Sequence, residues 1–542
     1  MPQTQQMIEL LKAMPKRTSR LQCIAKPIGL LILLFNVQLN IGQEKAEAST
    51  FSSQSGKDTS LGHPYIVLAS SPVSKPKSKV NTVCPAGLTA EIKGITERSQ
   101  FQRSRWGILI QTLSSGQTLY SRDAHHYFVP ASNVKILTTA AALYQLGPDF
   151  RMYTSVGRSN DGSLRIKGQG DPSLTDAQLR ALAQQLNRQG IRQFSQLIAE
   201  DDYFRGTAVN PSWEWEDVQV DYGAPVNSLI LNQNVLALKL LPQQLGQPLR
   251  VIWADPTEAT RWQIDNKSVT AQTGEPASIN VSRDLKGSVL KITGQLSLDS
   301  EPESVTLAEI DPGEKFLRHF RRALAVEGIN ETADPNRYSR ILKLLSMLGV
   351  ATKVDEVATV ESPPLSQLLI ETNQNSNNLY AEALLRTLGA KADSLDNSTS
   401  TADLGLGVVK ATLTHLGVDP TSYVLADASG LSRHNLASPE ALAQTLRAMA
   451  KSPQAAIYRA SLPIAGISGT LKNRFRDSAA QGIVQAKTGT MSGIVALSGY
   501  LDAPNYEPLV FSIIVNQSEQ PAATIRQAID EIVLLLVKLR HC

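Results

Sequence analysis

Residues 130–143 read PASNVKILTTAAAL, a run of small apolar residues that follows a proline. Small apolar residues of this kind favour a helix that is buried on most sides, and Gly147 marks its end. Ser132 and Lys135 stand three residues apart, so both project from one face at the start of the helix, where the dipole favours negative charge. The stretch therefore places a potential nucleophile beside a potential base.

A Ser-x-x-Lys pattern alone is weak evidence, because a chain of 542 residues contains such a pattern by chance. A second copy runs from Ser74 to Lys77, but it includes Pro76 in a polar stretch. Proline interrupts a helix interior, so this copy lacks the rigid helix that the chemistry needs. Ser132 and Lys135 are the better candidates.

Two further short motifs follow in the chain. Ser376-Asn377-Asn378 lies in a polar segment between helical stretches, and Lys487-Thr488-Gly489-Thr490 lies on a predicted strand. Ser278-Ile279-Asn280 also matches Ser-x-Asn, but it lies in an alternating, strand-like stretch. Each motif is weak alone, whereas the order Ser-x-x-Lys, Ser-x-Asn, Lys-Thr-Gly is specific.

These three motifs together are the signature of the active-site serine penicillin-recognising enzymes. Within that group the chain resembles the D-alanyl-D-alanine carboxypeptidase/endopeptidases of the low-molecular-mass class C penicillin-binding proteins, over nearly the whole mature sequence. The long segment between Lys135 and Ser376 is a further similarity, because this family inserts extra domains there. Ala428 stands where a glycine is expected, which affects one local turn. Other similar stretches are 168–174, 362–365, 427–433, 462–466 and 469–471.

The resemblance implies a catalytic role for each of the first two motifs. Ser132 would be the nucleophile, and Lys135 would be neutral in order to accept its proton, because a serine hydroxyl is a poor nucleophile without a base. Lys487 would remain protonated, and its charge would help to lower the pKa of Lys135. Ser376 would relay the proton to the departing D-alanine, while Asn378 would bind Lys135 or the substrate amide carbonyl.

The Lys-Thr-Gly strand is expected to bind the substrate. Lys487, Thr488 and Thr490 would hold the terminal carboxylate, while Gly489 would let the substrate approach as an added strand. The resemblance also implies an oxyanion hole formed by the backbone N–H groups of Ser132 and Thr490. No metal or cofactor is expected, and the seven histidines show no His-Glu-x-x-His spacing.

The predicted fold is multidomain α+β, with a β-lactamase/transpeptidase-like domain. A hairpin over 105–121 and strands over 483–490, 494–501 and 509–516 would form a five-stranded antiparallel sheet with flanking helices. A helical subdomain would hold Ser132 and Ser376. A helix from Pro521 onward would pack against the sheet, since its apolar residues are not matched by a basic face that would favour a membrane surface.

Domain boundaries follow from this assignment. The penicillin-recognising domain would take 84–148 and 362–542. Residues 149–361 would form one or two inserted α+β accessory domains. Within them, strands are predicted at 164–167, 235–241, 249–253 and 288–296, and helices at 176–188 and 313–327.

The N-terminal residues 1–48 have the features of a secretory signal peptide. Basic residues precede the apolar run Ile28–Phe35, and Ala46-Glu47-Ala48 offers small residues at the cleavage positions. The apolar run is far shorter than the roughly 20 residues that span a bilayer, which argues against a membrane anchor. Residues 49–83, rich in Ser, are expected to form a flexible linker. The mature protein would be periplasmic, without a stable membrane span.

Cys84 and Cys542 remain after signal removal, at the two ends of the mature chain. In an oxidising compartment they could form a disulfide, while two free thiols remain the alternative because sequence alone cannot fix pairing. Helices after Cys84 and before Cys542 are expected to lie together on one face of the sheet, which favours the disulfide.

A formal net charge of +4, concentrated near the N-terminus, gives no indication of a nucleic-acid partner. The leading function is a serine-type D-Ala-D-Ala carboxypeptidase, and also a DD-endopeptidase, that cleaves peptidoglycan stem peptides and cross-links through an acyl-enzyme on Ser132. β-Lactams such as penicillin would act as inhibitors by acylating the same oxygen. The alternatives are a β-lactamase-like hydrolase and a non-catalytic protein that binds the wall or senses β-lactams.

Overall fold

The computed structural model describes residues 82–284, 289–332, 354–392 and 398–542. The signal peptide predicted over 1–48 lies outside these residues, as does the linker predicted over 49–83 apart from its last two residues. The second Ser-x-x-Lys copy, from Ser74 to Lys77, also lies outside them.

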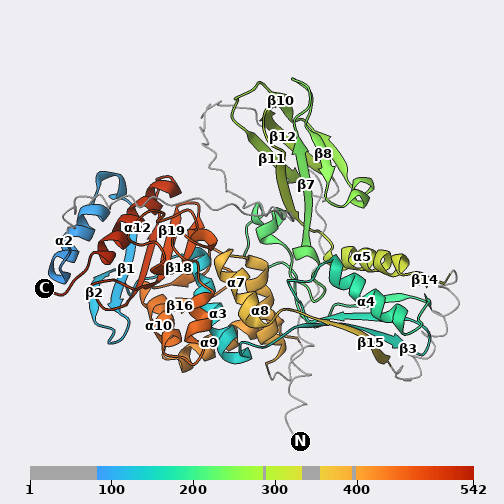
Figure 1. The fold of residues 1–542 in the computed structure, drawn as a ribbon, viewed down its shortest axis with the longest axis horizontal. Helices are drawn as coiled ribbons and strands as arrows, with labels where there is room; N and C mark the ends of the chain where they lie inside the picture. The colour runs from blue at the N-terminus through green and yellow to red at the C-terminus, as the bar shows by residue number, and fades with distance from the viewer. Residues whose placement is uncertain (1–81, 285–288, 333–353, 393–397) are drawn as a thin grey trace, which may run out of the picture. The chain divides into compact units, whose positions relative to one another are not determined.

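The predicted five-stranded antiparallel sheet is present, with the strand order β18-β19-β20-β1-β2 (Figure 1). Two neighbouring inner strands, β19 and β20, are buried at every residue. This burial explains why their sequences are almost continuously apolar. The strands are β1 (Arg105–Thr112), β2 (Thr118–Arg122), β18 (Val484–Met491), β19 (Ile494–Leu501) and β20 (Leu509–Asn516).

Side chains of this sheet alternate between two apolar clusters, as the pleat requires. Ile108 and Ile513 pack on one face with α2 (Pro85–Thr96) and α12 (Ala522–Val537). The neighbouring Ile514 packs on the other face, against the helices that carry the motifs. The last helix thus packs against the sheet, as predicted. No helix in the described ranges has the length and apolar character that a membrane span requires.

The helical subdomain surrounds α3 (Val134–Leu146), which is buried from Val134 to Leu143. Its small side chains allow neighbouring helices to approach closely. Ser132 lies in a 3-10 turn, η2 (Ala131–Asn133), that leads into α3, so it precedes the α-helix itself. The other helices are α7 (Leu365–Gln374), α8 (Asn378–Ala390), α9 (Thr401–His415), α10 (Pro439–Ala450) and α11 (Ala455–Ala460).

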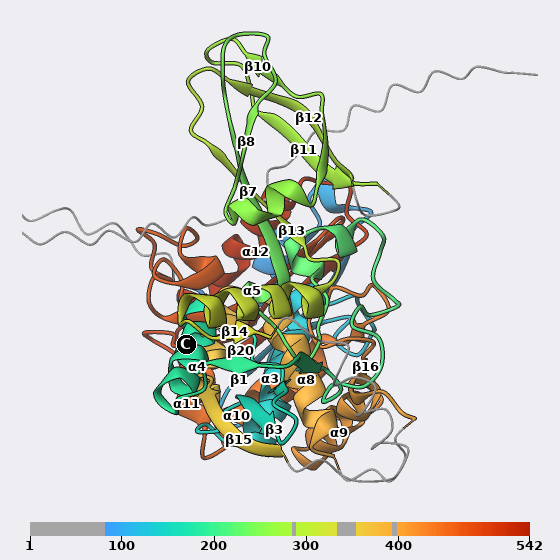
Figure 2. The same ribbon diagram turned by 90° about the vertical axis from the view of Figure 1, so that its right-hand side faces the viewer.

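The long segment between Lys135 and Ser376 contains a second sheet, ordered β15-β3-β4-β6. Its first and last strands along the chain, β3 and β15, are neighbours in this sheet. Because β3 and β15 are antiparallel neighbours, the chain leaves and re-enters the helical subdomain at one place. Helices α4 and α5 lie side by side in both views and share this sheet's apolar cluster (Figures 1 and 2). The elements are β3 (Tyr153–Ser159), β4 (Leu164–Gly168), β6 (Leu197–Glu200), β15 (Val354–Glu361), α4 (Asp176–Arg188) and α5 (Pro312–Val326).

Two smaller sheets, β13-β7-β8 and β10-β12-β11, share one apolar cluster, and β9 pairs with β12. The second Ser-x-Asn copy, 278–280, lies at the start of β11, on a strand as predicted. The strands are β7 (Val235–Leu241), β8 (Arg250–Trp253), β9 (Gln263–Asn266), β10 (Val269–Ala271), β11 (Ser278–Arg283), β12 (Val289–Ser297) and β13 (Glu303–Ala308). Short two-stranded pairs join β5 (Gln193–Phe194) to β14 (Asn330–Glu331) and β16 (Tyr423–Val424) to β17 (Leu436–Ala437).

Cys84 and Cys542 are joined by a disulfide, with their Cα atoms 5.9 Å apart. Beside it, Val83 N donates to Lys538 O at 3.0 Å, and Arg540 N donates to Val83 O at 3.1 Å. Helices α2 and α12 lie together in one apolar cluster on one face of the five-stranded sheet. The structure therefore contains the bridge rather than two free thiols.

Candidate active site

Two glycines, Gly430 and Gly489, lie directly against the turn that carries Ser132. Ala131 has a φ of 47°, in the left-handed region. A Cβ atom on Gly430 would lie 1.9 Å from Ala131 O, and a Cβ atom on Gly489 would lie 2.8 Å from Pro130 O. Both glycines therefore allow the backbone of the turn to approach closely. The lack of a side chain at Gly489 makes room for this turn, while the role toward the substrate that the resemblance implies for Gly489 stays a prediction.

Lys135 lies on the first turn of α3 and is fully buried. Its Nζ lies 3.0 Å from Ser132 Oγ, 2.6 Å from Asn378 Oδ1 and 2.7 Å from Ser429 O. Burial lowers the pKa of Lys135 to about 7, although the carboxylates of Asp427 and Glu382 act to raise it. Near neutral pH the amine can therefore lack its proton while it contacts the Ser132 hydroxyl.

Ser376 lies between α7 and α8 with a φ of 57° and contacts the second lysine. Lys487 Nζ, fully buried on β18, donates to Ser376 Oγ at 2.8 Å and to Thr488 O at 2.9 Å. Burial, and then the charge of Lys135, lower the pKa of Lys487 well below its ordinary value. Both acceptors are neutral oxygens, so they do not offset the desolvation of a second cation. Burial thus acts against the protonated form that the resemblance implies for Lys487, and that form stays a prediction.

Asn378 begins α8 and contacts Lys135. The preceding Asn377 caps the helix, since its side chain accepts a hydrogen bond from Tyr380 N. Asn378 Oδ1 accepts from Lys135 Nζ, while its Nδ2 donates to Tyr222 O at 2.9 Å. The expected partners of Asn378 were Lys135 and the substrate amide carbonyl, and the structure shows the contact with Lys135.

The remaining residues of the Lys-Thr-Gly motif lie on β18, at the edge of the five-stranded sheet. Thr490 is exposed, and Thr488 is half-buried. Thr488 Oγ1 donates to Thr470 Oγ1 at 2.7 Å, which adds a hydroxyl that the sequence does not single out. In the sequence, Thr470 is marked only by its place in 469–471, one of the stretches that resemble the family. An edge strand with hydroxyl side chains can receive an extended peptide that ends in a carboxylate.

Two buried carboxylates near Lys135, those of Glu382 and Asp427, are not predicted as site residues from the sequence. Glu382 follows Asn378 by one helical turn on α8, so both lie on one face of the helix. Its Oε1 accepts the N–H groups of Ala428 at 2.9 Å and Ser429 at 3.0 Å. The four-residue spacing from Asn378 was the available sequence signal for Glu382.

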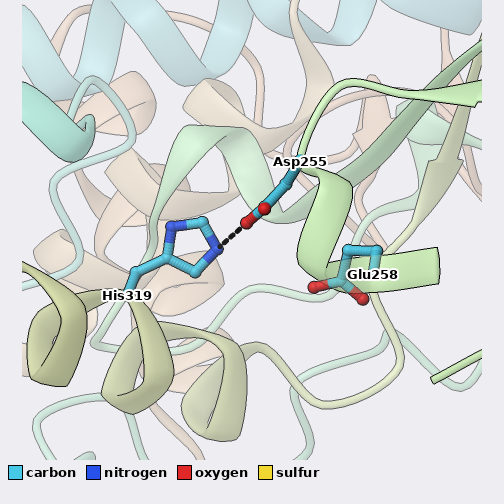
Figure 3. Close-up of side chains that lie close together, drawn as sticks. All are labelled: Asp255, Glu258 and His319. Carbon is cyan, nitrogen blue, oxygen red and sulfur yellow. Dashed lines mark ion pairs between the residues drawn. The ribbon is translucent and has the colours of Figure 1, made fainter. Parts of the chain in front are cut away.

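A group of potential metal ligands lies away from these motifs and consists of Asp255, Glu258 and His319 (Figure 3). His319 Nε2 lies 3.3 Å from Asp255 Oδ2. Arg322 donates to both carboxylate oxygens of Asp255, at 3.1 and 2.6 Å, and Arg318 donates to Glu258 at 2.7 Å. The hydrogen bond from Arg322 holds the pKa of Asp255 well below its usual range. Because guanidinium groups already neutralise both carboxylates, we assign the group to an ion-pair cluster.

Comparisons with known proteins identify relatives across nearly the whole described chain. A model of the D-Ala-D-Ala carboxypeptidase 3 (S13) family matches residues 88–535, a range that includes all three motifs. The D-alanyl-D-alanine carboxypeptidase of Actinomadura sp. (strain R39) is 32% identical over 458 residues, which cover 80% of this chain and 82% of that protein. The penicillin-sensitive carboxypeptidase A of Dictyostelium discoideum is 31% identical over 487 residues, covering 82% of this chain and 89% of that protein.

The fold has a counterpart among solved structures. The crystal structure of penicillin binding protein 4 from Haemophilus influenzae matches with a TM-score of 0.69 and 22% sequence identity. The match covers 82% of this chain and 98% of that chain. At this identity the likeness concerns the fold alone.

Proposed function

The chain belongs to the D-Ala-D-Ala carboxypeptidase 3 (S13) family, and we propose that it is a serine-type D-Ala-D-Ala carboxypeptidase with Ser132 as its nucleophile. The observation that carries the proposal is the fully buried Lys135 amine 3.0 Å from Ser132 Oγ. A serine hydroxyl needs a base to become a nucleophile, and burial lowers the pKa of this amine to about 7. Lys135 is therefore the base that we assign to Ser132.

In the acylation step, Ser132 Oγ forms a bond to the carbonyl carbon of the penultimate D-alanine, and its proton passes to Lys135 Nζ. The backbone N–H groups of Ser132 and Thr490 would stabilise the oxyanion, and loss of one such donor lowers a rate by about 10²- to 10³-fold. The C–N bond to the terminal D-alanine then breaks, and Ser376 relays to the leaving nitrogen the proton that Lys135 took from Ser132. Water finally hydrolyses the Ser132 ester and releases the shortened peptide.

The substrate's terminal carboxylate would bind beside Lys487, Thr488 and Thr490. β18 is an edge strand. Its Val484 and Ala486 already bond to residues 463–465, and the later part of the edge, at Thr488 and Thr490, supports this placement because an extended peptide can add there as a further strand. A bound carboxylate would also raise the pKa of Lys487, since an opposite charge stabilises its protonated form. Substrate binding would thus favour the protonated form of Lys487.

The same site would accept related substrates outside the cytoplasm. A D-alanyl cross-link between peptidoglycan stem peptides carries the same type of bond, so DD-endopeptidase activity belongs to the proposal. A β-lactam would acylate Ser132 Oγ and leave slowly. The proposed location is the periplasm, which rests on the signal-peptide pattern of residues 1–48.

One pair of assays tests the assignment. The purified protein is incubated with labelled penicillin and, separately, with a pentapeptide that ends in D-Ala-D-Ala. We expect stable labelling together with release of D-alanine, and we expect a cross-linked muropeptide dimer to be cleaved. Rapid destruction of penicillin without stable labelling would indicate a β-lactamase-like hydrolase, and labelling without release would indicate a sensing protein. A Ser132→Ala variant that releases D-alanine at the wild-type rate would refute the nucleophile.

A further inference from the structure

The loop of residues 427–432 supports both reacting groups of the site. Its Ser429 carbonyl accepts a hydrogen bond from Lys135 Nζ at 2.7 Å. Its Gly430, with a φ of +84°, lies so close to the nucleophile turn that a Cβ atom there would reach Ala131 O. Thr138, on α3, donates to the Ala428 carbonyl at 2.9 Å. A small movement of this loop would therefore displace the base and the nucleophile together.

Asp427 stabilises the loop by accepting hydrogen bonds from backbone N–H groups within it. Its Oδ1 accepts from Gly430 N at 2.7 Å, and its Oδ2 accepts from Ser432 N at 2.6 Å. The Gly430 N–H and the Ser429 carbonyl belong to one peptide unit. The negative charge of Asp427 therefore polarises the carbonyl that binds the Lys135 amine.

Glu382, on the neighbouring helix α8, binds the loop through its side chain. The residue is 1% exposed. Its Oε1 accepts the two adjacent N–H groups of Ala428 and Ser429 at 2.9 and 3.0 Å. Because Asn378 lies one turn earlier on the same helix, α8 acts on Lys135 in two ways: directly through the Asn378 amide, and through the loop that Glu382 anchors.

We propose that Glu382 is a positioning residue for the reaction: it anchors the 427–432 loop and places a buried carboxylate near Lys135. The proposal rests on the proposed function, because it takes Lys135 as the base of Ser132. Glu382 does not touch the Ser132 hydroxyl, so it acts through Lys135 and the loop.

The charges around Glu382 determine whether its loss raises or lowers the pKa of Lys135. The carboxylates of Asp427 and Glu382 act to raise the pKa of Lys135. Burial, followed by the charge of Asp427, raises the pKa of Glu382 to about 7, while Arg386 acts to lower it. Other charged groups lie on elements that pack against α8 or face Lys135: Asp403 and Lys410 on α9, Glu371 on α7, Asp221 on η4 (Asp221–Gly223) and Lys487 on β18, together with Asp171 near Tyr380.

Lys135 must be neutral to act as a base, so the acylation rate rises with pH through the Lys135 pKa. Removal of the Glu382 charge leaves the Lys135 cation with one fewer counter-charge, which lowers that pKa. The rise in rate should then occur at lower pH. A merely structural role of Glu382 would change stability without moving this rise.

The test compares the pH dependence of Ser132 acylation by labelled penicillin in the wild type and in Glu382→Gln. Glutamine keeps an oxygen that can accept from Ala428 and Ser429 but has no charge. We expect the midpoint of the rise to move down by about one pH unit. Glu258→Gln is the matched control, because Glu258 is equally buried in the ion-pair cluster: its midpoint should equal that of the wild type. A Glu382→Gln midpoint at or above the wild-type value overturns the proposal.

Glu382→Asp keeps the proposal testable if Glu382→Gln does not fold. Aspartate retains the charge but is shorter, so the midpoint should stay in place while the plateau rate falls by about tenfold, because the loop is displaced. An unchanged plateau would overturn the anchoring role. If the wild type itself is not acylated, the proposed function fails as well, whereas an acylated wild type with an unshifted Glu382→Gln profile refutes this inference alone.

Discussion

Ser376 and Ser278 form a matched pair at the scale of single residues, because each begins a Ser-x-Asn sequence. Ser376 Oγ accepts from Lys487 Nζ at 2.8 Å, whereas Ser278 begins β11 in the inserted segment. Ser376→Ala should reduce D-alanine release by about 10²-fold or more, since a positioned proton-transfer group typically contributes that much. Ser278→Ala should leave the rate unchanged. Equal rates for the two variants in a steady-state assay would contradict the relay role.

The reacting residues were predictable because their spacing is local. Ser132, in the 3-10 turn η2, and Lys135, on the first turn of α3, stand three residues apart, and this short spacing brings them to 3.0 Å. The lowered pKa of Lys487 was not predictable, because it depends on burial and on the charge of Lys135, which the fold brings near it. The role of Glu382 was not predictable for a similar reason: its partners, Ala428 and Ser429, are brought to it only by the fold.

At the scale of elements, β18 and the nucleophile turn are held in contact by the lack of a side chain at Gly489. A Cβ atom there would lie 2.8 Å from Pro130 O and 3.2 Å from Ala131 Cβ. Gly489→Ala should therefore push the turn away, destabilise the domain by about 1–3 kcal/mol and slow penicillin acylation by about 10²-fold. Calorimetry and labelling kinetics measure the two effects.

Gly94 supplies the control for this substitution. It lies within α2, and a Cβ atom there would meet nothing within 4 Å. Gly94→Ala should leave the acylation rate unchanged and raise stability by about 1 kcal/mol, because alanine favours a helix over glycine. If Gly489→Ala were acylated as fast as Gly94→Ala, the turn would not depend on this close approach.

Strand positions were predictable where the sequence is continuously apolar. Strands β19 and β20 have the bounds expected from their composition, since both of their faces are buried. Strand pairing in the inserted segment was not predictable. β12 pairs antiparallel with β11 but parallel with β9 and β10, and no local pattern specifies such partners.

At the scale of the whole molecule, the inserted segment also supports the loop behind Lys135. Trp213 Nε1 donates to Asp427 Oδ2 at 2.9 Å, and Ser212 Oγ donates to Ser432 Oγ at 2.7 Å. Tyr222 O accepts from Asn378 Nδ2. The segment therefore contributes to the site through backbone and buried side-chain contacts, which a composition-based domain boundary does not reveal.

The disulfide joins residues separated by 458 positions, so it restricts the unfolded chain over almost the whole described sequence. A bridge of this kind typically contributes about 2–4 kcal/mol, mainly through the unfolded state. Replacing both Cys84 and Cys542 by serine should lower the midpoint of thermal unfolding accordingly. Penicillin acylation of Ser132 at ambient temperature should persist, because α2 and α12 pack on the face of the sheet opposite to α3.

Reductant provides an independent check on this prediction. Treatment of the wild type should reproduce the lower unfolding midpoint, whereas the double serine variant should not respond. Mass mapping without reduction should find Cys84 and Cys542 in one linked peptide pair. Two free thiols, or an unchanged midpoint in the double variant, would show that the ends of the domain are held together by the contacts between α2 and α12 and by the hydrogen bonds of Val83 alone.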